Sequence, residues 1–160
     1  MTNDDYISAV KRNSQRLYML ALSFTKNHSD AEDIMQDVFL KLLRHNKSFN
    51  NEEHLDKWLT VVCVNESKNY IKSPFRKNTV LLDEAKDLYT FDTVNDYDIF
   101  KSVMSLPKKE RTVIHLFYYE DLPVKEIAKM LKIKESAVKT RLSRGRKHLK
   151  EMLGDELIYE

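Results

Sequence analysis

Hydrophobic side chains recur every third or fourth residue along most of this chain, a period that predicts amphipathic α-helices. The pattern occupies six segments: residues 5–26, 30–45, 54–72, 107–119, 123–131 and 135–153. The chain also has only 2 Gly and 3 Pro. Because the tight turns of sheets draw on both residues, their scarcity favours helices as well. The sequence therefore predicts an all-α fold.

A break in the pattern divides the chain into two parts. Ser73 precedes Pro74, and since the residue before a proline is disfavoured in the α region, the preceding helix ends there. Residues 74–95 then show no clear period. We therefore expect two small helical domains, residues 1–73 and 96–153, joined by a flexible linker, residues 74–95. Residues 154–160 are expected to form a short acidic tail.

Composition bears on the compartment. A single cysteine, Cys63, excludes an internal disulfide and a multi-thiolate zinc site. No apolar run approaches the roughly 20 residues that span a membrane, and the acidic start of the chain lacks the apolar segment of a signal peptide. We expect a cytoplasmic protein that does not insert into a membrane by itself.

Charge is distributed unevenly. The formal net charge is +2, but residues 79–106 carry 2 basic and 6 acidic side chains, whereas residues 107–153 carry 13 basic and 6 acidic ones. A basic segment of this kind is typical of a surface that contacts nucleic acid, or of an ordinary solvated helix face.

The helix over 30–45 has two distinct faces when its residues are placed at 100° steps. One face is apolar and predicts core: Ala31, Ile34, Met35, Val38 and Leu42. The opposite face carries acids, an amide, a leucine and an arginine: Asp33, Gln36, Asp37, Leu40 and Arg44. An exposed leucine among ordered polar groups fits the centre of a contact with a partner helix, although single exposed leucines are also ordinary.

Residues 45–53 predict a polar loop with an aromatic side chain, Phe49, at its tip. On the next helix, Leu55, Trp58, Leu59 and Val62 form the expected core stripe. A second stripe holds Lys57, Val61, Val64, Asn65, Lys68 and Lys72. Cations at helical spacing near an aromatic ring suit single-stranded nucleic acid. The alternative is a solvated surface helix with Phe49 packed against the core.

The last two segments predict a helix-turn-helix, because a short helix is followed by a three-residue connection and a longer basic helix. The inner stripe of the last helix is Val138, Leu142, Gly145, Leu149 and Leu153. Its outer arc holds small hydroxyls and cations: Ser136, Lys139, Thr140, Ser143, Arg144 and Lys147, flanked by Arg141 and Arg146. Short side chains with cations allow a helix to enter the major groove of DNA.

Three sequence blocks resemble the sigma-70 family of RNA polymerase sigma factors, in the short extracytoplasmic-function (ECF) type that keeps only regions 2 and 4. The blocks are DAEDIMQDVFLKLL at 30–43, HLDKWLTVVCVNESKNYI at 54–71, and residues 106–149. The resemblance implies a factor that binds core RNA polymerase and promoter DNA, recognises the −35 and −10 elements and promotes strand opening. It also implies regulation by an anti-sigma factor.

The same resemblance implies roles for the faces described above. The face with Asp33, Gln36, Asp37 and Leu40 would bind core polymerase. The −10 element, with one base flipped from the opened strand, would be recognised by Phe49, Asn65, Lys68, Asn69 and Lys72. The −35 element would be contacted by Ser136, Lys139, Thr140, Ser143, Arg144, Arg146 and Lys147. The acidic linker would thread through the polymerase.

The resemblance is imperfect at the turn of the helix-turn-helix. Lys132, Lys134 and Ala137 stand where the family usually has Gly, Ser and Thr. Loss of a capping hydroxyl costs about 1 kcal/mol, and a non-glycine residue at positive φ adds a similar strain. We therefore expect the turn to differ locally, with Ser136 as the candidate replacement cap.

Two alternatives stay open from sequence. The last block also resembles the DNA-binding domain of response-regulator-type activators, which act beside a separate sigma factor, although the first half shows no strand pattern for a receiver domain. An enzyme is the other alternative. The five histidines show no ligand spacing, and no P-loop, GxSxG or HExxH motif occurs, so we expect no catalysis, cofactor or metal.

Overall fold

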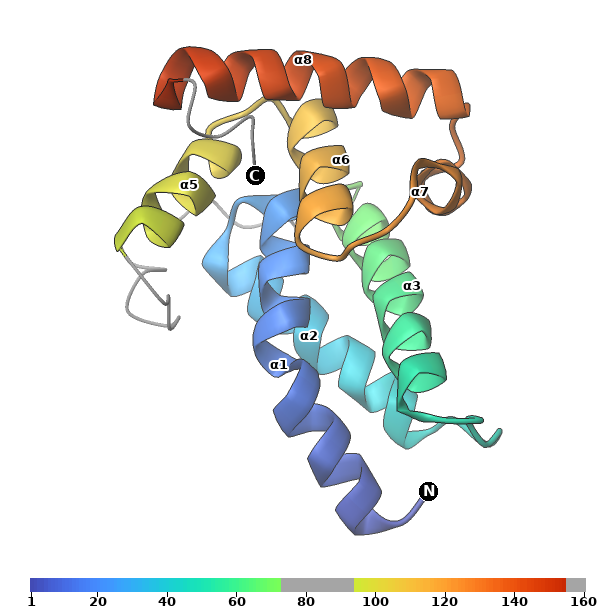
Figure 1. Ribbon diagram of the computed structural model, residues 1–160. Coiled ribbons are helices and arrows are strands. Elements are labelled where there is room, and N and C mark those ends of the chain that lie inside the picture. Colours follow the sequence, from blue (N-terminus) through green and yellow to red (C-terminus); the bar gives the residue numbers. More distant parts are fainter. Residues whose placement is uncertain (73–93, 155–160) are drawn as a thin grey trace. The chain divides into compact units, whose positions relative to one another are not determined.

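A computed structural model describes residues 1–72 and 94–154, and every regular element in these two ranges is an α-helix (Figure 1). In chain order they are α1 (Asn3–Thr25), α2 (His28–Leu43), α3 (Glu52–Ile71), α5 (Val94–Met104), α6 (Lys108–Tyr118), α7 (Val124–Leu131) and α8 (Glu135–Leu153). The all-α prediction is confirmed. The first and last residues of each predicted segment lie within two residues of the first and last residues of the helix that it matches.

The chain divides into two compact units, Met1–Val80 and Leu81–Glu160. Most of the predicted linker, 74–93, and residues 155–160 of the predicted tail lie outside the described residues. The last two linker residues are already helical, because α5 begins at Val94. The linker prediction was wrong for those two positions.

In the first unit α1, α2 and α3 all pack against one another around an apolar core. The largest side chains with almost no exposure are Leu17, Leu20, Leu22, Ile34, Leu42 and Leu59. Three predicted core residues, Met35, Trp58 and Val62, are only half-buried. They lie at the margin of the contact among the three helices. The sequence pattern alone does not show where that contact ends.

The α1–α2 junction is a turn of two residues. Lys26 adopts the left-handed conformation (φ 53°), which ends α1, and the side chain of Asn27 caps α2. Asn27 Oδ1 accepts a hydrogen bond from the backbone N–H of Asp30 at 2.9 Å. Asp30 lies buried in the first turn of α2, where the helix dipole favours a negative charge.

A set of polar contacts fixes the start of α3 against α1. Arg12 Nη2 donates to Asp56 Oδ1 at 2.7 Å, Asn13 donates to the same oxygen at 3.0 Å, and Arg16 Nη1 donates to Thr60 Oγ1 at 2.6 Å. Burial raises the pKa of Asp56, but the hydrogen bonds from Arg12 and Asn13 outweigh that effect and hold the pKa below its usual value.

In the second unit α8 packs on α5, α6 and α7, which all lie on one side of it (Figure 1). Phe100, Met104, Leu116 and Ile127 are fully buried there. The predicted inner stripe of α8 is confirmed for Val138, Leu142, Gly145 and Leu149, and Leu153 is half-buried. The opposite side of α8 is exposed as far as the described residues of this unit show.

The turn between α7 and α8 keeps a left-handed residue although that residue is not glycine. Lys132 has φ 57° and ψ 46°, and the N–H of Ile133 donates to the carbonyl of Ala128 at 3.0 Å. Lys134 is the N-cap of α8 and makes no side-chain capping bond. The candidate cap at Ser136 was therefore wrong, because α8 begins at Glu135 with Lys134 as its N-cap.

Candidate nucleic-acid and protein interfaces

The predicted partner face of α2 is mostly accessible. Gln36 and Asp37 are exposed, and 44 % of the surface of Leu40 is exposed. Asp33 is half-buried, because the hydroxyl of Tyr70 on α3 donates to its Oδ2 at 2.9 Å. Leu43, 60 % exposed, extends the apolar part of this face. Sequence reasoning missed it, although it lies three residues after Leu40 and therefore on a neighbouring position of the helix surface.

Charges on α2 and α3 meet along the edge of this face. Lys41 forms an ion pair with Glu66. Partial burial raises the pKa of Asp37, and the neighbouring carboxylates of Glu66 and Asp33 raise it further against the opposing effect of Lys41. Burial and the hydrogen bond to Asp33 raise the pKa of Tyr70 to about 12. The Tyr70 hydroxyl therefore stays protonated at neutral pH and remains a donor to Asp33.

Phe49 is not the exposed loop tip that the sequence predicts. It is half-buried and packs among three other rings. Its ring stacks on His45 with centroids 4.9 Å apart and meets Trp58 and His54 edge-on at 5.5 and 5.3 Å. Four rings close together hold the loop in place, since each aromatic pair adds roughly 0.5–1.5 kcal/mol beyond burial.

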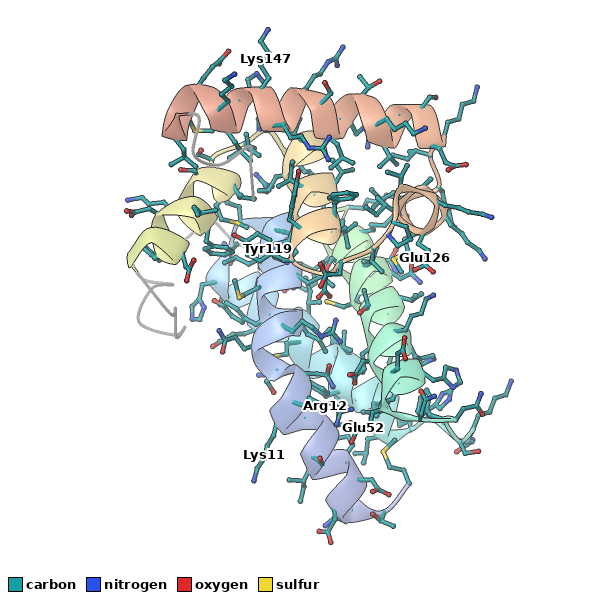
Figure 2. All side chains as sticks on the ribbon, in the orientation of Figure 1. Lys11, Arg12, Glu52, Tyr119, Glu126 and Lys147 are labelled. Atoms are coloured by element: carbon teal, nitrogen blue, oxygen red, sulfur yellow. The ribbon has the colours of Figure 1, made fainter. Side chains whose placement is uncertain are left out.

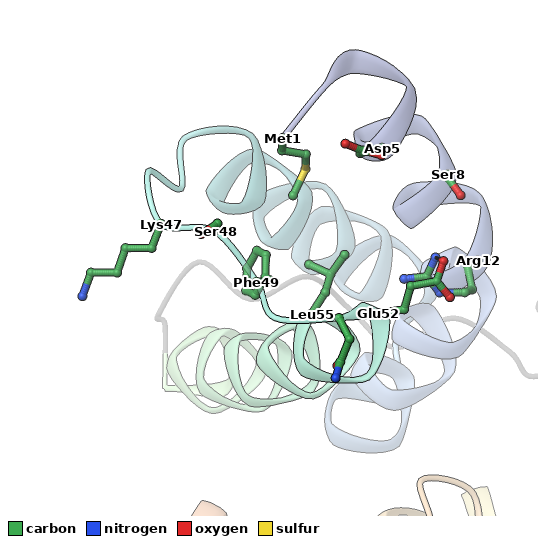
Figure 3. Close-up of a pocket in the computed structure, with 10 residues that line it drawn as sticks. Met1, Asp5, Ser8, Arg12, Lys47, Ser48, Phe49, Glu52 and Leu55 are labelled. Carbon is green, nitrogen blue, oxygen red and sulfur yellow. Dashed lines mark ion pairs between the residues drawn. The ribbon is translucent and has the colours of Figure 1, made fainter.

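One side of Phe49 still faces a pocket of about 340 Å³ (Figure 3). Its lining comes from the start of α1, from the loop before α3 and from the start of α3: Met1, Asp5, Ser8, Arg12, Lys47, Ser48, Phe49, Asn51, Glu52 and Leu55. Arg12 Nη1 lies 3.5 Å from Glu52 Oε1 within it. The pocket therefore joins an aromatic wall to donors and acceptors. Sequence reasoning gave no role to the α1 side, whose residues are distant along the chain.

The other residues predicted to contact the −10 element lie further along α3. Asn65, Asn69 and Lys72 are exposed and Lys68 is half-buried. The structure thus groups these four residues on the C-terminal half of α3 and does not bring Asn65 into the pocket that Phe49 lines. Val64, placed on the same outer stripe from sequence, is fully buried, so that stripe was drawn too wide.

The outer arc of α8 is an open polar surface. Ser136, Lys139, Thr140, Ser143, Arg144 and Lys147 are all exposed. Lys147 points away from the three helices that α8 covers (Figure 2). The Thr140 hydroxyl donates to the Ser136 carbonyl at 3.0 Å, which leaves its oxygen able to accept a bond from outside. The first two thirds of α8 therefore present short hydroxyls and cations together.

Arg146 is held differently from the other cations of α8. Its Nε donates to the Tyr118 hydroxyl at 2.7 Å, and its guanidinium lies 5.4 Å from the centre of the Phe117 ring. A guanidinium at this distance is attracted to the ring face. Arg146 is thus oriented along α6, at the flank of the arc, and the sequence gave no sign of these contacts.

Among the described residues, no three His, Cys, Asp or Glu side chains are placed to hold a metal ion. Within the same ranges, no helix is long and apolar enough to cross a membrane.

Two family models match the chain: sigma-70 region 2 over residues 9–76 and sigma-70, region 4 over residues 99–149. The chain belongs to the sigma-70 family. The region 2 match spans the unit that holds the α2 face and the pocket, and the region 4 match spans the helix-turn-helix.

Curated relatives cover nearly the whole of this sigma-70 family chain. RNA polymerase sigma factor SigV of Bacillus subtilis is 29% identical over 94% of the chain and 92% of its own length. ECF RNA polymerase sigma factor SigW of the same organism is 29% identical over 95% and 90%. The ECF RNA polymerase sigma-E factor of Haemophilus influenzae is 24% identical over 96% of each. The recognition as an ECF-type factor is confirmed.

Solved structures show the same fold. The sigma factor RpoE of Bartonella quintana, in complex with the anti-sigma factor NepR, aligns with a TM-score of 0.68 and 22% identity over 95% of this chain and 98% of that one. CnrH, in complex with the cytosolic domain of CnrY, aligns with a TM-score of 0.62 and 22% identity over 95% and 89%.

Proposed function

We propose that this chain is an RNA polymerase sigma factor of the ECF type. It binds core polymerase, recognises the −35 and −10 elements of a promoter and promotes strand opening. The observation that carries the proposal is the pair of sigma-70 regions in one chain, region 2 followed by region 4, with relatives named as sigma factors that align over 92% and 90% of their own length. It acts as an initiation factor and performs no catalysis itself.

The polymerase-binding surface is the outer face of α2. Gln36, Asp37 and Leu40 are accessible there, while the opposite face of the same helix is committed to the core. An exposed leucine surrounded by polar groups is the usual composition of an interface centre and its rim. Asp33 belongs to this surface at its edge and is oriented by Tyr70.

The −10 element is recognised in two places on the first unit. The pocket beside Phe49 takes a base flipped from the opened strand, since it offers a ring for stacking and polar groups for the base edge. Asn65, Lys68, Asn69 and Lys72 contact the adjacent strand along α3. This arrangement refines the sequence hypothesis, because Asn65 acts on the strand beside the pocket and not within it.

The −35 element is recognised in duplex DNA by α8. Lys139 and Thr140 lie in the N-terminal part of this helix, which enters the major groove in helix-turn-helix proteins, and Ser143 and Arg144 lie at its middle. Ser136 joins them, because Lys134 and not Ser136 is the cap. Lys147 and Arg146 contact phosphates at the edges, Arg146 from a position fixed by Tyr118.

An anti-sigma factor is the proposed regulator, since one similar solved structure holds the sigma factor RpoE with the anti-sigma factor NepR, and another holds CnrH with the cytosolic domain of CnrY. The proposed site of action is the cytoplasm, where promoter and polymerase are found. The response-regulator alternative is disfavoured, because every regular element in the described part of the N-terminal unit is a helix and this unit matches sigma-70 region 2.

The deciding experiment is transcription from a promoter library with core polymerase and this chain as the only initiation factor. We expect specific initiation, and loss of core binding by several-fold or more when Asp33 and Asp37 are both replaced by Lys, with the helical circular dichroism intact. Initiation that requires a second sigma factor would favour the activator alternative. Unchanged core affinity in the double variant would remove this face of α2 from the interface.

A further inference from the structure

Two contacts join α2 to α3 at the edge of the face that binds polymerase. At one, the Tyr70 hydroxyl donates to Asp33 Oδ2 at 2.9 Å. At the other, Glu66 pairs with Lys41. Asp33 and Lys41 are two helical turns apart on α2, and Glu66 and Tyr70 are one turn apart on α3. Because the higher number on one helix pairs with the lower number on the other, the two contacts follow an antiparallel pair of helices.

Asp37 lies between these two contacts. It is midway between Asp33 and Lys41 on α2, and the carboxylates of Glu66 and Asp33 both raise its pKa. The charge of Glu66 therefore acts on Lys41 and Asp37 together. Glu66 keeps only 18 % of its side-chain surface exposed, so it is largely covered by the helices that it joins and is unavailable as a broad contact surface.

The two contacting residues of α3 alternate with residues proposed to bind the −10 strand. Asn65 precedes Glu66, and Asn69 precedes Tyr70. Successive residues of a helix are 100° apart, so a rotation of α3 that moved Glu66 and Tyr70 would move Asn65 and Asn69 with them. The contacts to α2 thus set the direction in which the exposed amides of α3 point.

We propose that Tyr70 and Glu66 are positioning residues that hold the −10-binding surface of α3 in a fixed orientation to the polymerase-binding helix α2. This inference rests on the proposed function. According to this inference, neither the Tyr70 nor the Glu66 side chain contacts DNA. Each contributes by fixing the helix that presents the DNA-binding amides once α2 is bound to polymerase.

The test compares two tyrosine variants that each remove one hydroxyl bonded to α2. Tyr70→Phe removes the bond to Asp33. The control, Tyr6→Phe, removes a bond of the same kind, in which the Tyr6 hydroxyl donates to the Phe39 carbonyl at 3.1 Å on another side of α2. Open-complex formation is measured by permanganate footprinting at saturating core polymerase, so that weaker binding to polymerase does not reduce the signal.

We expect Tyr70→Phe to slow opening by about two- to tenfold, the range that corresponds to one net hydrogen bond, and Tyr6→Phe to leave opening unchanged. Combining Tyr70→Phe with Asp33→Ala should cause no further loss, because both variants break the same bond. For the second contact, Glu66→Lys should slow opening, and Lys41→Glu in the same chain should restore it by reversing the ion pair.

Three results would overturn the inference alone while the wild-type chain still opens the promoter: normal opening by Tyr70→Phe, an equal defect in Tyr6→Phe, or no restoration by the charge reversal at Lys41 and Glu66. An equal defect would mean a general loss of stability, and failed restoration would mean that Glu66 contacts DNA or polymerase directly. Absence of opening by the wild-type chain would overturn the proposed function itself.

Discussion

Phe49 belongs both to a cluster of packed rings and to the wall of a pocket. Its ring is packed against His45, His54 and Trp58 on one side and borders the pocket on the other. The two hypotheses drawn from sequence, a stacking surface or a packed core residue, are therefore not exclusive. The local sequence is polar around a single aromatic, and only the fold brings Trp58 and the start of α1 to it.

Replacement of this ring tests its second role. Phe49→Ala should reduce strand opening and leave closed-complex formation near normal, because a lost stacking surface costs roughly 1–3 kcal/mol per base. Permanganate reactivity and filter binding measure the two steps. His45→Ala is the control, since His45 stacks on Phe49 but does not line the pocket. Equal opening defects in the two variants would assign the effect of Phe49 to the ring cluster.

His115 is a residue whose role is invisible in the sequence. It is 1 % exposed on α6, and its ring stacks on Tyr119 with centroids 4.8 Å apart. Burial lowers its pKa to about 3, so the ring is neutral in the folded protein. A histidine of the unfolded chain has an ordinary pKa near 6.5. Between these values the unfolded chain binds one more proton than the folded protein.

This difference predicts that stability falls as pH falls. The contribution of neutral His115 is fully present above the unfolded pKa and is lost as pH decreases below it, by about 2 kcal/mol between pH 7 and pH 5. Urea denaturation followed by circular dichroism measures the free energy of unfolding at each pH. In His115→Gln the pH dependence over this interval should be smaller by that amount. An equal slope in both proteins would contradict the prediction.

At the scale of the helix, α6 and α8 approach closely because Gly145 has no side chain. A Cβ built at Gly145 would lie 2.7 Å from Cγ1 of Ile114, which is itself 1 % exposed. The sequence pattern correctly places Gly145 on the inner stripe. It could not indicate that Ile114 fills the space beside it, because that contact joins two helices whose separation is set by the whole unit.

Gly145→Ala should therefore destabilise the protein by about 1–2 kcal/mol, although alanine favours a helix by about 1 kcal/mol over glycine. The double variant Gly145→Ala with Ile114→Ala should lose less than the sum of the two single variants, because the second change makes room for the added methyl group. Thermal denaturation measures each. Ser143→Ala, on the exposed side of α8, is the control and should be neutral or slightly stabilising.

The turn before α8 carries two unfavourable residues that the packing tolerates. Lys132→Gly should stabilise the protein by about 0.5–1 kcal/mol, since glycine removes the strain of a left-handed residue. Lys134→Ser should add about 1 kcal/mol by supplying the missing capping hydroxyl. As a control, Lys129→Gly within α7 should destabilise by about 1 kcal/mol. Denaturant midpoints that fall in both turn variants would show that these lysines make compensating contacts.

At the scale of the whole molecule, the helices and their inner faces could be predicted because periodicity depends only on local spacing. Ala31, Ile34, Val38 and Leu42 are all buried as expected. The surroundings of the sites could not be predicted. Asp33 accepts a hydrogen bond from Tyr70, 37 positions away, and Arg146 donates one to Tyr118, 28 positions away. Such partners depend on how helices pack. The exposed faces of α2 and α8 could be predicted because each face is local to one helix.

Two cations on the outer face of α8, Arg144 and Lys147, are proposed to make different kinds of DNA contact. Lys147 is exposed and points away from the core (Figure 2). It lies toward the C-terminal part of the helix, and we assign it to a phosphate. Arg144 lies at the middle of α8, closer than Lys147 to the N-terminal half that enters the groove in this motif, and we assign it to a base edge. The two cations should therefore differ in how they respond to sequence and to salt.

Replacement of each cation by alanine tests this assignment. Arg144→Ala should cost about 1–3 kcal/mol and relax preference at one base position. Lys147→Ala should weaken binding evenly across sequences and lower the salt slope by about one ion. Polymerase holoenzyme binding to single-base variants of the −35 element, titrated at several salt concentrations, measures both effects. The assignment of Arg144 fails if its variant weakens binding to every sequence equally, because a phosphate contact alone has that signature.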